Sequence, residues 1–186
     1  MTYSNADLAL AFPAAVRDDA LHVASALTQP ILDTETFSVC AGGETVHIPY
    51  RIYHDPALIN REDLTPIQKE LLDCLFTRHH DGVVREKHLR RIICSHHAWI
   101  PPFVVQLVGE YVIEILDTIR DSIGHLEPEL YQTFLRSNPE YFALTQQRAE
   151  SYWNCNHRHT PRGSYSGFQI VDYFVRLAGS GNLPEK

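Results

Sequence analysis

The sequence predicts a mainly α-helical fold, either a helical bundle or a stack of helix pairs, with one small β-hairpin. Residues 101–123 are the first reason: apolar side chains recur there at steps of three and four, and only a narrow stripe is polar. A helix this apolar belongs inside a bundle, so we expect a buried central helix over these residues. Two amphipathic segments, residues 65–80 and 83–94, are the second reason. The third is Gly42-Gly43, flanked by alternating segments, which indicates a hairpin over about residues 36–53.

The chain has 186 residues, of which 44% are hydrophobic, enough for one buried core and short for two. We therefore expect a single mainly helical domain over residues 1–178 and a flexible tail over residues 179–186. The start of the chain lacks the basic region of a secretory signal. Polar residues interrupt the longest apolar run, so no membrane span is expected.

The formal net charge is −7 with the eleven histidines counted as neutral. Nucleic acid and anionic membranes repel a chain of this charge, so we expect neither as a partner. The histidine-rich composition makes the charge sensitive to pH between about 5 and 7. The four cysteines are scattered, which is typical of reduced thiols in the cytoplasm rather than of a disulfide framework.

The elements before residue 60 can be placed from proline and glycine. Residues 7–29 are predicted to be helical with a break or new start at Pro13, and Pro30 ends the helix. The two strands follow, and Pro49 makes the second an edge strand or a bulge. A lone hairpin is marginal in water, so we expect it to pack against helices.

A pair of helices comes next. Thr65-Pro66 supplies an N-cap and a proline at the first helical position, and Asp81-Gly82 is typical of the turn between the two helices. The second helix has apolar residues for its inner face. Its basic residues are expected on the outer face: Arg85, Lys87, Arg90 and Arg91.

The turn and second helix read Asp81-x-x-Val84-Arg85-x-x-His88-Leu89-x-x-Ile92. This pattern resembles a HEAT-type helical repeat, in which an Asp turn is followed by Val-Arg and then by apolar positions. His88 departs from the pattern, because such repeats usually carry a small residue there. The resemblance covers one helix pair and implies a helical surface of the kind that interacts with other proteins.

Three helices are expected in the C-terminal part besides the central one. Glu127-Pro128 begins a helix that runs to about Ser137, and Asn138-Pro139 begins a longer one that runs to Cys155. Residues 157–167 are polar and rich in Ser, Gly and Arg, so they are expected to form a surface loop. Residues 168–177 form the last helix.

Two short clusters of histidine and cysteine are candidate zinc ligands. Cys94-x-His96-His97 and Cys155-x-His157-x-His159 each follow the expected end of a helix. Zinc binds these residue types, and two such segments together can form a tetrahedral site. The alternative is that the histidines occupy last turns because a cation suits the negative end of a helix dipole. We favour the alternative, because neither spacing is that of a known zinc motif.

His80-Asp81 is similar to the His-Asp dipeptide of the HD-type metal phosphohydrolases, which are all helical. His54 before it and Asp117 or Asp121 after it stand in the order that this family uses. That chemistry requires the dipeptide inside a helix, whereas Gly82 directly after Asp81 favours a turn.

Four carboxylates of the central helix form an acidic stripe. Glu110, Glu114, Asp117 and Asp121 follow at spacings of four, three and four, which places them on one side of a helix. Arg120 can pair with Asp117, so the partners of Glu110 and Glu114 must come from elsewhere. Arginine partners would make the stripe structural, and a bound metal would make it an active site. We favour the structural interpretation.

Aromatic residues and arginines are candidates for partner binding, because they dominate the hot spots of protein interfaces. The candidates are Trp99, Trp153 and Tyr165, with Arg85, Arg90 and Arg91 on the basic helix face. The alternative for the aromatic residues is core packing, where most aromatic residues on helices lie.

Two function classes remain open. The first is a non-catalytic protein-interaction or regulatory module without a cofactor, whose partner is another protein or a second copy of this chain. The second is a metal-dependent enzyme of the hydrolase type that holds zinc or another divalent metal. Its ligands would come from His80, Asp81, His96, His97, Glu110, Glu114, His157 and His159. We favour the first class, because every metal motif departs from a known site in spacing or in structural context.

Overall fold

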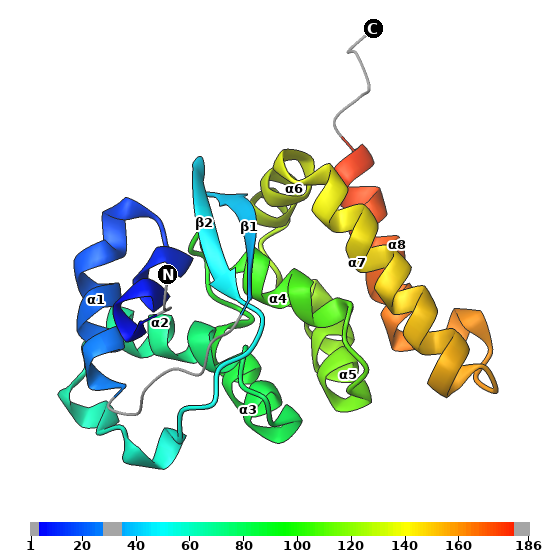
Figure 1. Ribbon diagram of the computed structural model, residues 1–186. Coiled ribbons are helices and arrows are strands. Elements are labelled where there is room, and N and C mark those ends of the chain that lie inside the picture. The colour runs from blue at the N-terminus through cyan, green and yellow to red at the C-terminus, as the bar shows by residue number, and fades with distance from the viewer. Residues whose placement is uncertain (1–3, 28–34, 181–186) are drawn as a thin grey trace, which may run out of the picture. The chain divides into compact units, whose positions relative to one another are not determined.

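The computed structural model describes residues 4–27 and 35–180. Helices predominate in these residues and the two strands form an antiparallel hairpin, which confirms the predicted fold class (Figure 1). The chain divides into two compact units, Met1–Ile92 and Ile93–Lys186. Within the described residues, no helix is both long and apolar enough to cross a membrane. The single domain over residues 1–178 stays a prediction, and all of the predicted tail beyond Ser180 lies outside the described residues.

The first unit begins with the 3-10 helices η1 (Asn5–Ala11) and η2 (Ala14–Val16), followed by α1 (Arg17–Ala26). The break predicted at Pro13 is therefore confirmed: this proline has an extended conformation and no amide hydrogen to continue a helix. The predicted end at Pro30 lies outside the described residues. The side chains that these helices bury include Leu8, Phe12, Val16 and Val23.

The hairpin consists of β1 (Thr36–Ala41) and β2 (Glu44–Pro49). The turn residues Gly42 and Gly43 have φ angles of 61° and 83°, the left-handed region that glycine enters without steric cost. Buried and exposed positions alternate in β1. β2 ends at Pro49, earlier than predicted, and contacts η1 as expected for a hairpin packed on helices.

The helix pair of the first unit is α2 (Pro66–Phe76) and α3 (Gly82–Ile92), preceded by the short η3 (Pro56–Leu58) and η4 (Arg61–Asp63). Thr65 caps α2 in a capping box with Gln68. The prediction that Arg85 lies on the outer face of α3 is wrong. Its side chain is 1% exposed, and Nη1 donates to the carbonyls of His79 and His80, 2.8 Å away in each case. Arg85 therefore ties α3 to the turn that precedes it.

The second unit corrects the prediction of one helix over residues 101–123. Two helices form there, α4 (Pro101–Val108) and α5 (Ile113–Ser122). Gly109, which destabilises a helix interior, caps α4, and Val112 is extended. A Cβ atom at Gly109 would lie 3.3 Å from Cβ of Arg148, so only glycine fits this close approach without a shift. Every residue of α4 is buried, which agrees with the predicted burial of this stretch.

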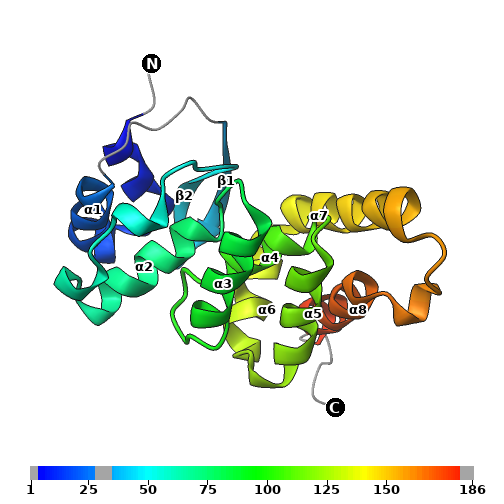
Figure 2. The same cartoon turned by 90° about the horizontal axis from the view of Figure 1, so that it is seen from below.

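The remaining elements of the second unit are η5 (Ile123–His125), α6 (Pro128–Ser137), α7 (Pro139–Tyr152) and α8 (Ser166–Gly179). α4 contacts α5, α6, α7 and α8, so it forms the core of the unit. α7 and α8 lie side by side, and residues 153–165 join them at one end (Figures 1 and 2).

Candidate functional site

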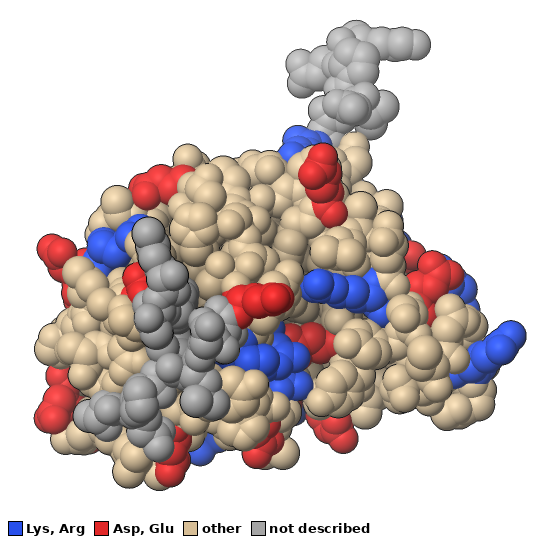
Figure 3. All heavy atoms as spheres, in the orientation of Figure 1, with Lys and Arg blue, Asp and Glu red and all other residues tan. Residues whose placement is uncertain are grey.

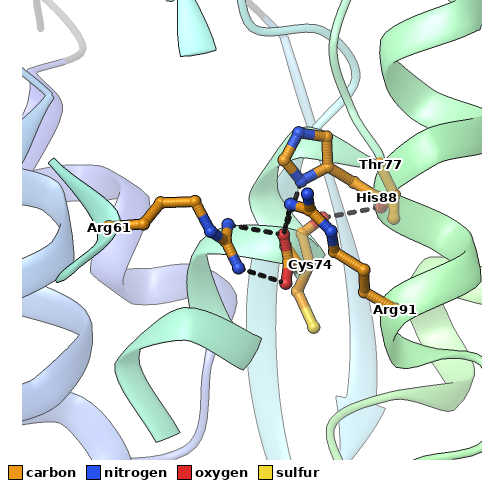
Figure 4. Close-up of polar contacts among 6 residues, drawn as sticks. Arg61, Cys74, Thr77, His88 and Arg91 are labelled. Atoms are coloured by element: carbon orange, nitrogen blue, oxygen red, sulfur yellow. Dashed lines mark hydrogen bonds and ion pairs between the residues drawn. The ribbon is translucent and has the colours of Figure 1, made fainter. Parts of the chain in front are cut away.

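A buried carboxylate on α2, Asp73, is the centre of an ionic cluster in the first unit (Figure 4). Arg61 of η4 donates to both carboxylate oxygens, Nη1 to Oδ1 at 2.8 Å and Nη2 to Oδ2 at 2.9 Å. From α3, Nδ1 of His88 lies 2.5 Å from Oδ1 and Nη1 of Arg91 lies 3.2 Å from it. Asp73 and His88 are only 4% and 3% exposed. We call these four residues the Asp73 cluster.

The electrostatics of the Asp73 cluster fix its charge states. Burial acts to raise the pKa of Asp73, but the hydrogen bonds from His88 and Arg61 and the positive charge of Arg61 outweigh burial, so the pKa lies below its usual value. Burial lowers the pKa of His88, and the contact with Asp73 only partly opposes this. Asp73 is therefore ionised and His88 neutral at neutral pH, with Nδ1–H donating to the carboxylate. The ring of His88 also stacks on Phe76, 4.7 Å between centroids.

A neutral histidine oriented by a carboxylate is the base half of a hydrolytic triad, so the neighbouring nucleophiles matter. Cys74 is fully buried, and burial together with the charges of Glu70 and Asp73 raises the pKa of its thiol, which keeps it unreactive. The hydroxyl of Thr77 donates to the carbonyl of Cys74 at 2.6 Å. The interactions of the Asp73 cluster thus connect η4, α2 and α3, which is a structural role.

The predicted metal ligands of the first unit lie in the turn between α2 and α3. His80 is exposed and stacks on Tyr53, 5.0 Å between ring centroids. Oδ1 of Asp81 accepts from the amide of Val83 at 2.8 Å, as expected for a turn that starts a helix. His80-Asp81 therefore lies in a turn and not inside a helix.

The predicted ligands that follow α3 lie in the second unit. His96 is exposed and contacts Glu127, with Nδ1 3.2 Å from Oε2. His97 stacks on Trp99 at 4.2 Å between centroids, and Trp99 itself is buried. Across residues 4–27 and 35–180, no three His, Cys, Asp or Glu side chains are grouped so that they could hold a metal ion.

The predicted acidic stripe does not exist as one row on one helix. Glu110 is buried in the segment between α4 and α5, whereas Glu114 is exposed in the first turn of α5. Arg120 binds Asp117 and Asp121, each at 2.8 Å. The hydroxyl of Ser166 donates to Asp117 at 2.5 Å and connects α5 to α8. Asp117 and Asp121 are therefore ion-paired, and a structural role for the stripe stays a prediction.

The connection from α7 into α8 has an unusual backbone and a dense set of ring contacts. α7 ends in a π-helix, Trp153–His157, and the chain then turns through η7 (Arg162–Ser164) into α8. Trp153 and Tyr165 both meet Phe168 edge-on, with ring centroids 5.4 Å apart in each pair. We call residues 153–168 the recognition segment.

Several further contacts connect side chains within the recognition segment. The indole Nε1 of Trp153 donates to the carbonyl of Thr160 at 3.0 Å. His157 stacks on Tyr165 at 5.3 Å between centroids, and the guanidinium of Arg162 lies 3.8 Å from the centroid of Phe168. Tyr165 and Phe168 are buried, and we call these two rings the floor of the segment.

Glycine is required where the recognition segment enters α8. A Cβ atom at Gly167 would lie 2.5 Å from Cε1 of the buried Tyr165 ring, closer than real Cβ contacts. Elsewhere in the segment, polar and basic side chains are exposed: Asn154, Cys155, Asn156, Arg158, His159, Arg162 and Ser164.

The predicted partner-binding residues divide into buried and accessible groups. Arg85, Trp99 and Tyr165 are buried, so they do not form an accessible surface. Arg90 and Arg91 are exposed on α3, where Arg90 pairs with Glu86 and Arg91 with Asp73. Trp153 is partly exposed.

Arg158 and Arg162 were not predicted from the sequence as parts of this surface. The sequence pattern that could have indicated them is a pair of arginines in a loop that contains Gly and Ser and is bounded by aromatic residues.

Comparisons of this chain with protein-family models, with curated proteins and with solved structures found no match.

Proposed function

We propose that this chain is a non-catalytic protein-interaction module and that the recognition segment makes the contact with the partner. The observation that carries the proposal is an irregular segment fixed by aromatic packing, with Arg158, His159 and Arg162 exposed. Tryptophan, tyrosine and arginine are the residue types that dominate interface hot spots.

The fixed conformation supports binding because ordering a loop costs free energy. Immobilising a flexible side chain on association costs about 0.5–1.5 kcal/mol. In the free protein, the rings of Trp153, Tyr165 and Phe168 already restrict this segment, so a partner would not have to order it. The π-helix adds support, since such turns occur frequently at functional sites.

In this proposal the first unit serves as a scaffold. The HEAT-like pair α2 and α3 is held together by the Asp73 cluster, whose charged groups pair with one another. We also place the module in the cytoplasm, because its cysteines Cys40, Cys74, Cys94 and Cys155 are all free.

Photo-crosslinking from a native cysteine tests the proposal. Cys155 is exposed within the recognition segment, and Cys94 is exposed outside it. A benzophenone maleimide is attached to Cys155 in a Cys40→Ser, Cys94→Ser variant. The matched control carries the same group on Cys94 in a Cys40→Ser, Cys155→Ser variant. Both proteins are irradiated in extract of the source cells, and the adducts are identified by mass spectrometry.

We expect one defined adduct from Cys155 that is not formed from Cys94. Excess unlabelled wild-type protein should compete with its formation, and an unlabelled Gly167→Ala variant should compete less well because its Tyr165 floor is displaced. An adduct of two copies of this chain would identify self-association as the interaction. Equal adducts from both positions, or no adduct that wild-type protein competes for, would refute the proposal.

A further inference from the structure

The recognition segment has a local charge opposite to that of the whole chain. Residues 153–168 contain Arg158, Arg162, His157 and His159 and no Asp or Glu, whereas the chain has a formal net charge of −7. On the face shown in Figure 3, basic and acidic side chains are interspersed. The local charge of this segment therefore determines which partner it attracts more than the net charge of the chain does.

The guanidinium of Arg162 lies over the ring of Phe168 and also reaches solvent. Its carbon Cζ lies over the ring of Phe168, 3.8 Å from the ring centroid, while the side chain is 60% exposed. Stacking uses the face of a guanidinium and leaves its N–H edge available. That edge matches the two oxygens of a carboxylate, which it can bind through two parallel hydrogen bonds.

A carboxylate already lies near this edge. Oε1 of Glu150 on α7 is 3.6 Å from Nη1 of Arg162, an ion pair longer than a hydrogen bond, and both side chains are more than half exposed. Exposed pairs of this kind contribute little to stability, so a carboxylate from a partner can replace Glu150 at small cost.

We infer that the recognition segment binds an acidic segment of a protein, with an Asp or Glu carboxylate on the N–H edge of Arg162 and Arg158 as a second basic contact. This inference rests on the proposed function and names the partner chemistry of the same surface. Arginine binds carboxylates and phosphates through the same N–H edge, so the test must compare the two kinds of anion. The partly exposed indole of Trp153 gives an apolar neighbour for the residue beside the carboxylate.

Fluorescence anisotropy with defined peptides tests the inference. The probe is a fluorescein-labelled ten-residue peptide with six Glu and two Phe and an amidated C-terminus. A second probe has Gln in place of Glu and a free C-terminus, which separates side-chain carboxylates from a terminal carboxylate. A third carries phosphoserine in place of two Glu of the first.

Three variants separate a specific contact from general charge attraction. Arg162→Glu reverses the charge, and Arg162→Lys keeps the charge but loses the planar edge. Arg90→Glu is the control, because Arg90 is comparably exposed, at 63%, and gives the same change in net charge outside the segment. Circular dichroism verifies that each variant is folded.

We expect the Glu peptide to bind the wild-type protein and the Gln peptide not to bind. Loss of a charge-assisted hydrogen bond corresponds to a weakening of about tenfold or more, so Arg162→Glu should raise Kd by at least that factor. Arg162→Lys should raise Kd by about threefold, and Arg90→Glu should leave it within about twofold.

Equal weakening by Arg162→Glu and Arg90→Glu would overturn the inference, as would tighter binding of the Gln or the phosphoserine peptide. Its failure can be told apart from failure of the proposed function. If the crosslink from Cys155 forms but the Glu peptide does not bind, the recognition segment contacts a partner of different chemistry.

Discussion

Asp73 is charged although it is buried, because two arginines and a histidine compensate for the loss of hydration. The amphipathic pattern of α2 does not predict this ionic cluster. Asp73 stands between buried apolar neighbours, and its partners come from η4 and α3. The same limit explains Arg85, which was expected on the surface because arginines usually lie there. Pairing of buried charges depends on contacts between elements, which spacing along one helix does not reveal.

Substituting Asp73→Asn should destabilise the first unit. The substitution removes the negative charge but leaves the buried His88 and the two arginines in place. Breaking a buried ion pair costs about 3–5 kcal/mol, and because Arg61 and Arg91 reach solvent we expect about 2–3 kcal/mol here. Urea unfolding followed by circular dichroism measures the change. Asp18→Asn, at an exposed site of α1, is the control and should change stability by less than about 0.5 kcal/mol.

Stability should fall on mild acidification because His88 is neutral in the folded protein. Its folded pKa lies below the value near 6.5 of the unfolded chain. As the pH falls below 6.5, the unfolded state takes up the proton first, so the free energy of unfolding decreases until the folded pKa is passed. His79, whose pKa burial and the neighbouring His80 also lower, acts in the same direction.

The variant His88→Asn isolates this effect, because it keeps a donor for Asp73 and removes the titrating ring. Urea unfolding at pH 7, 6 and 5 should show a smaller loss of stability for the variant than for the wild type. An unchanged slope would assign the acid sensitivity to other groups.

At the scale of elements, proline and the Gly-Gly turn were the reliable signals, because each constrains the backbone locally. They predicted the break at Pro13, the hairpin turn and the start of α2. The prediction of one helix over residues 101–123 was wrong because the apolar period continues across Gly109, which caps α4 and lies close to Arg148. A glycine within an apolar period is a helix-ending signal that periodicity alone does not reveal.

Gly167→Ala should disturb the floor of the recognition segment. The new methyl group would meet the ring of Tyr165, which is fixed between His157 and Phe168 and has little room to move. Overpacking of this kind typically costs about 1–3 kcal/mol. Urea unfolding and the emission maximum of Trp153, in a Trp99→Phe background, report the effect.

The matched control is Gly163→Ala, at a position with no atom within 4 Å of the added carbon. It should leave the stability within about 0.5 kcal/mol of wild type. Equal effects of the two substitutions would show that the floor is not tightly packed.

At the scale of the whole molecule, each compact unit has its own buried residues. The first unit buries Leu8, Phe12, Val46, Leu71 and Phe76, and the second buries Phe103, Leu107, Ile119, Tyr131 and Phe174. The apolar periodicity predicted the fold class correctly, because helical periodicity is a strong signal over long segments. Composition does not predict whether a chain of this length forms one compact unit or two.

We expect the fragment Met1–Ile92 to fold alone, since the Asp73 cluster and the hairpin lie entirely within it. Its circular dichroism should show helix that is lost in a cooperative thermal transition. A fragment without such a transition would instead support the single domain predicted over residues 1–178.

The central claim is that the recognition segment, rather than the basic face of α3, contacts the protein partner. Amide hydrogen exchange of the full chain, with and without the partner captured from Cys155, tests it most directly. We predict slower exchange in residues 153–168 on binding and unchanged exchange in α3. Protection of α3 with no change in residues 153–168 would contradict the claim and assign binding to the helix pair α2 and α3.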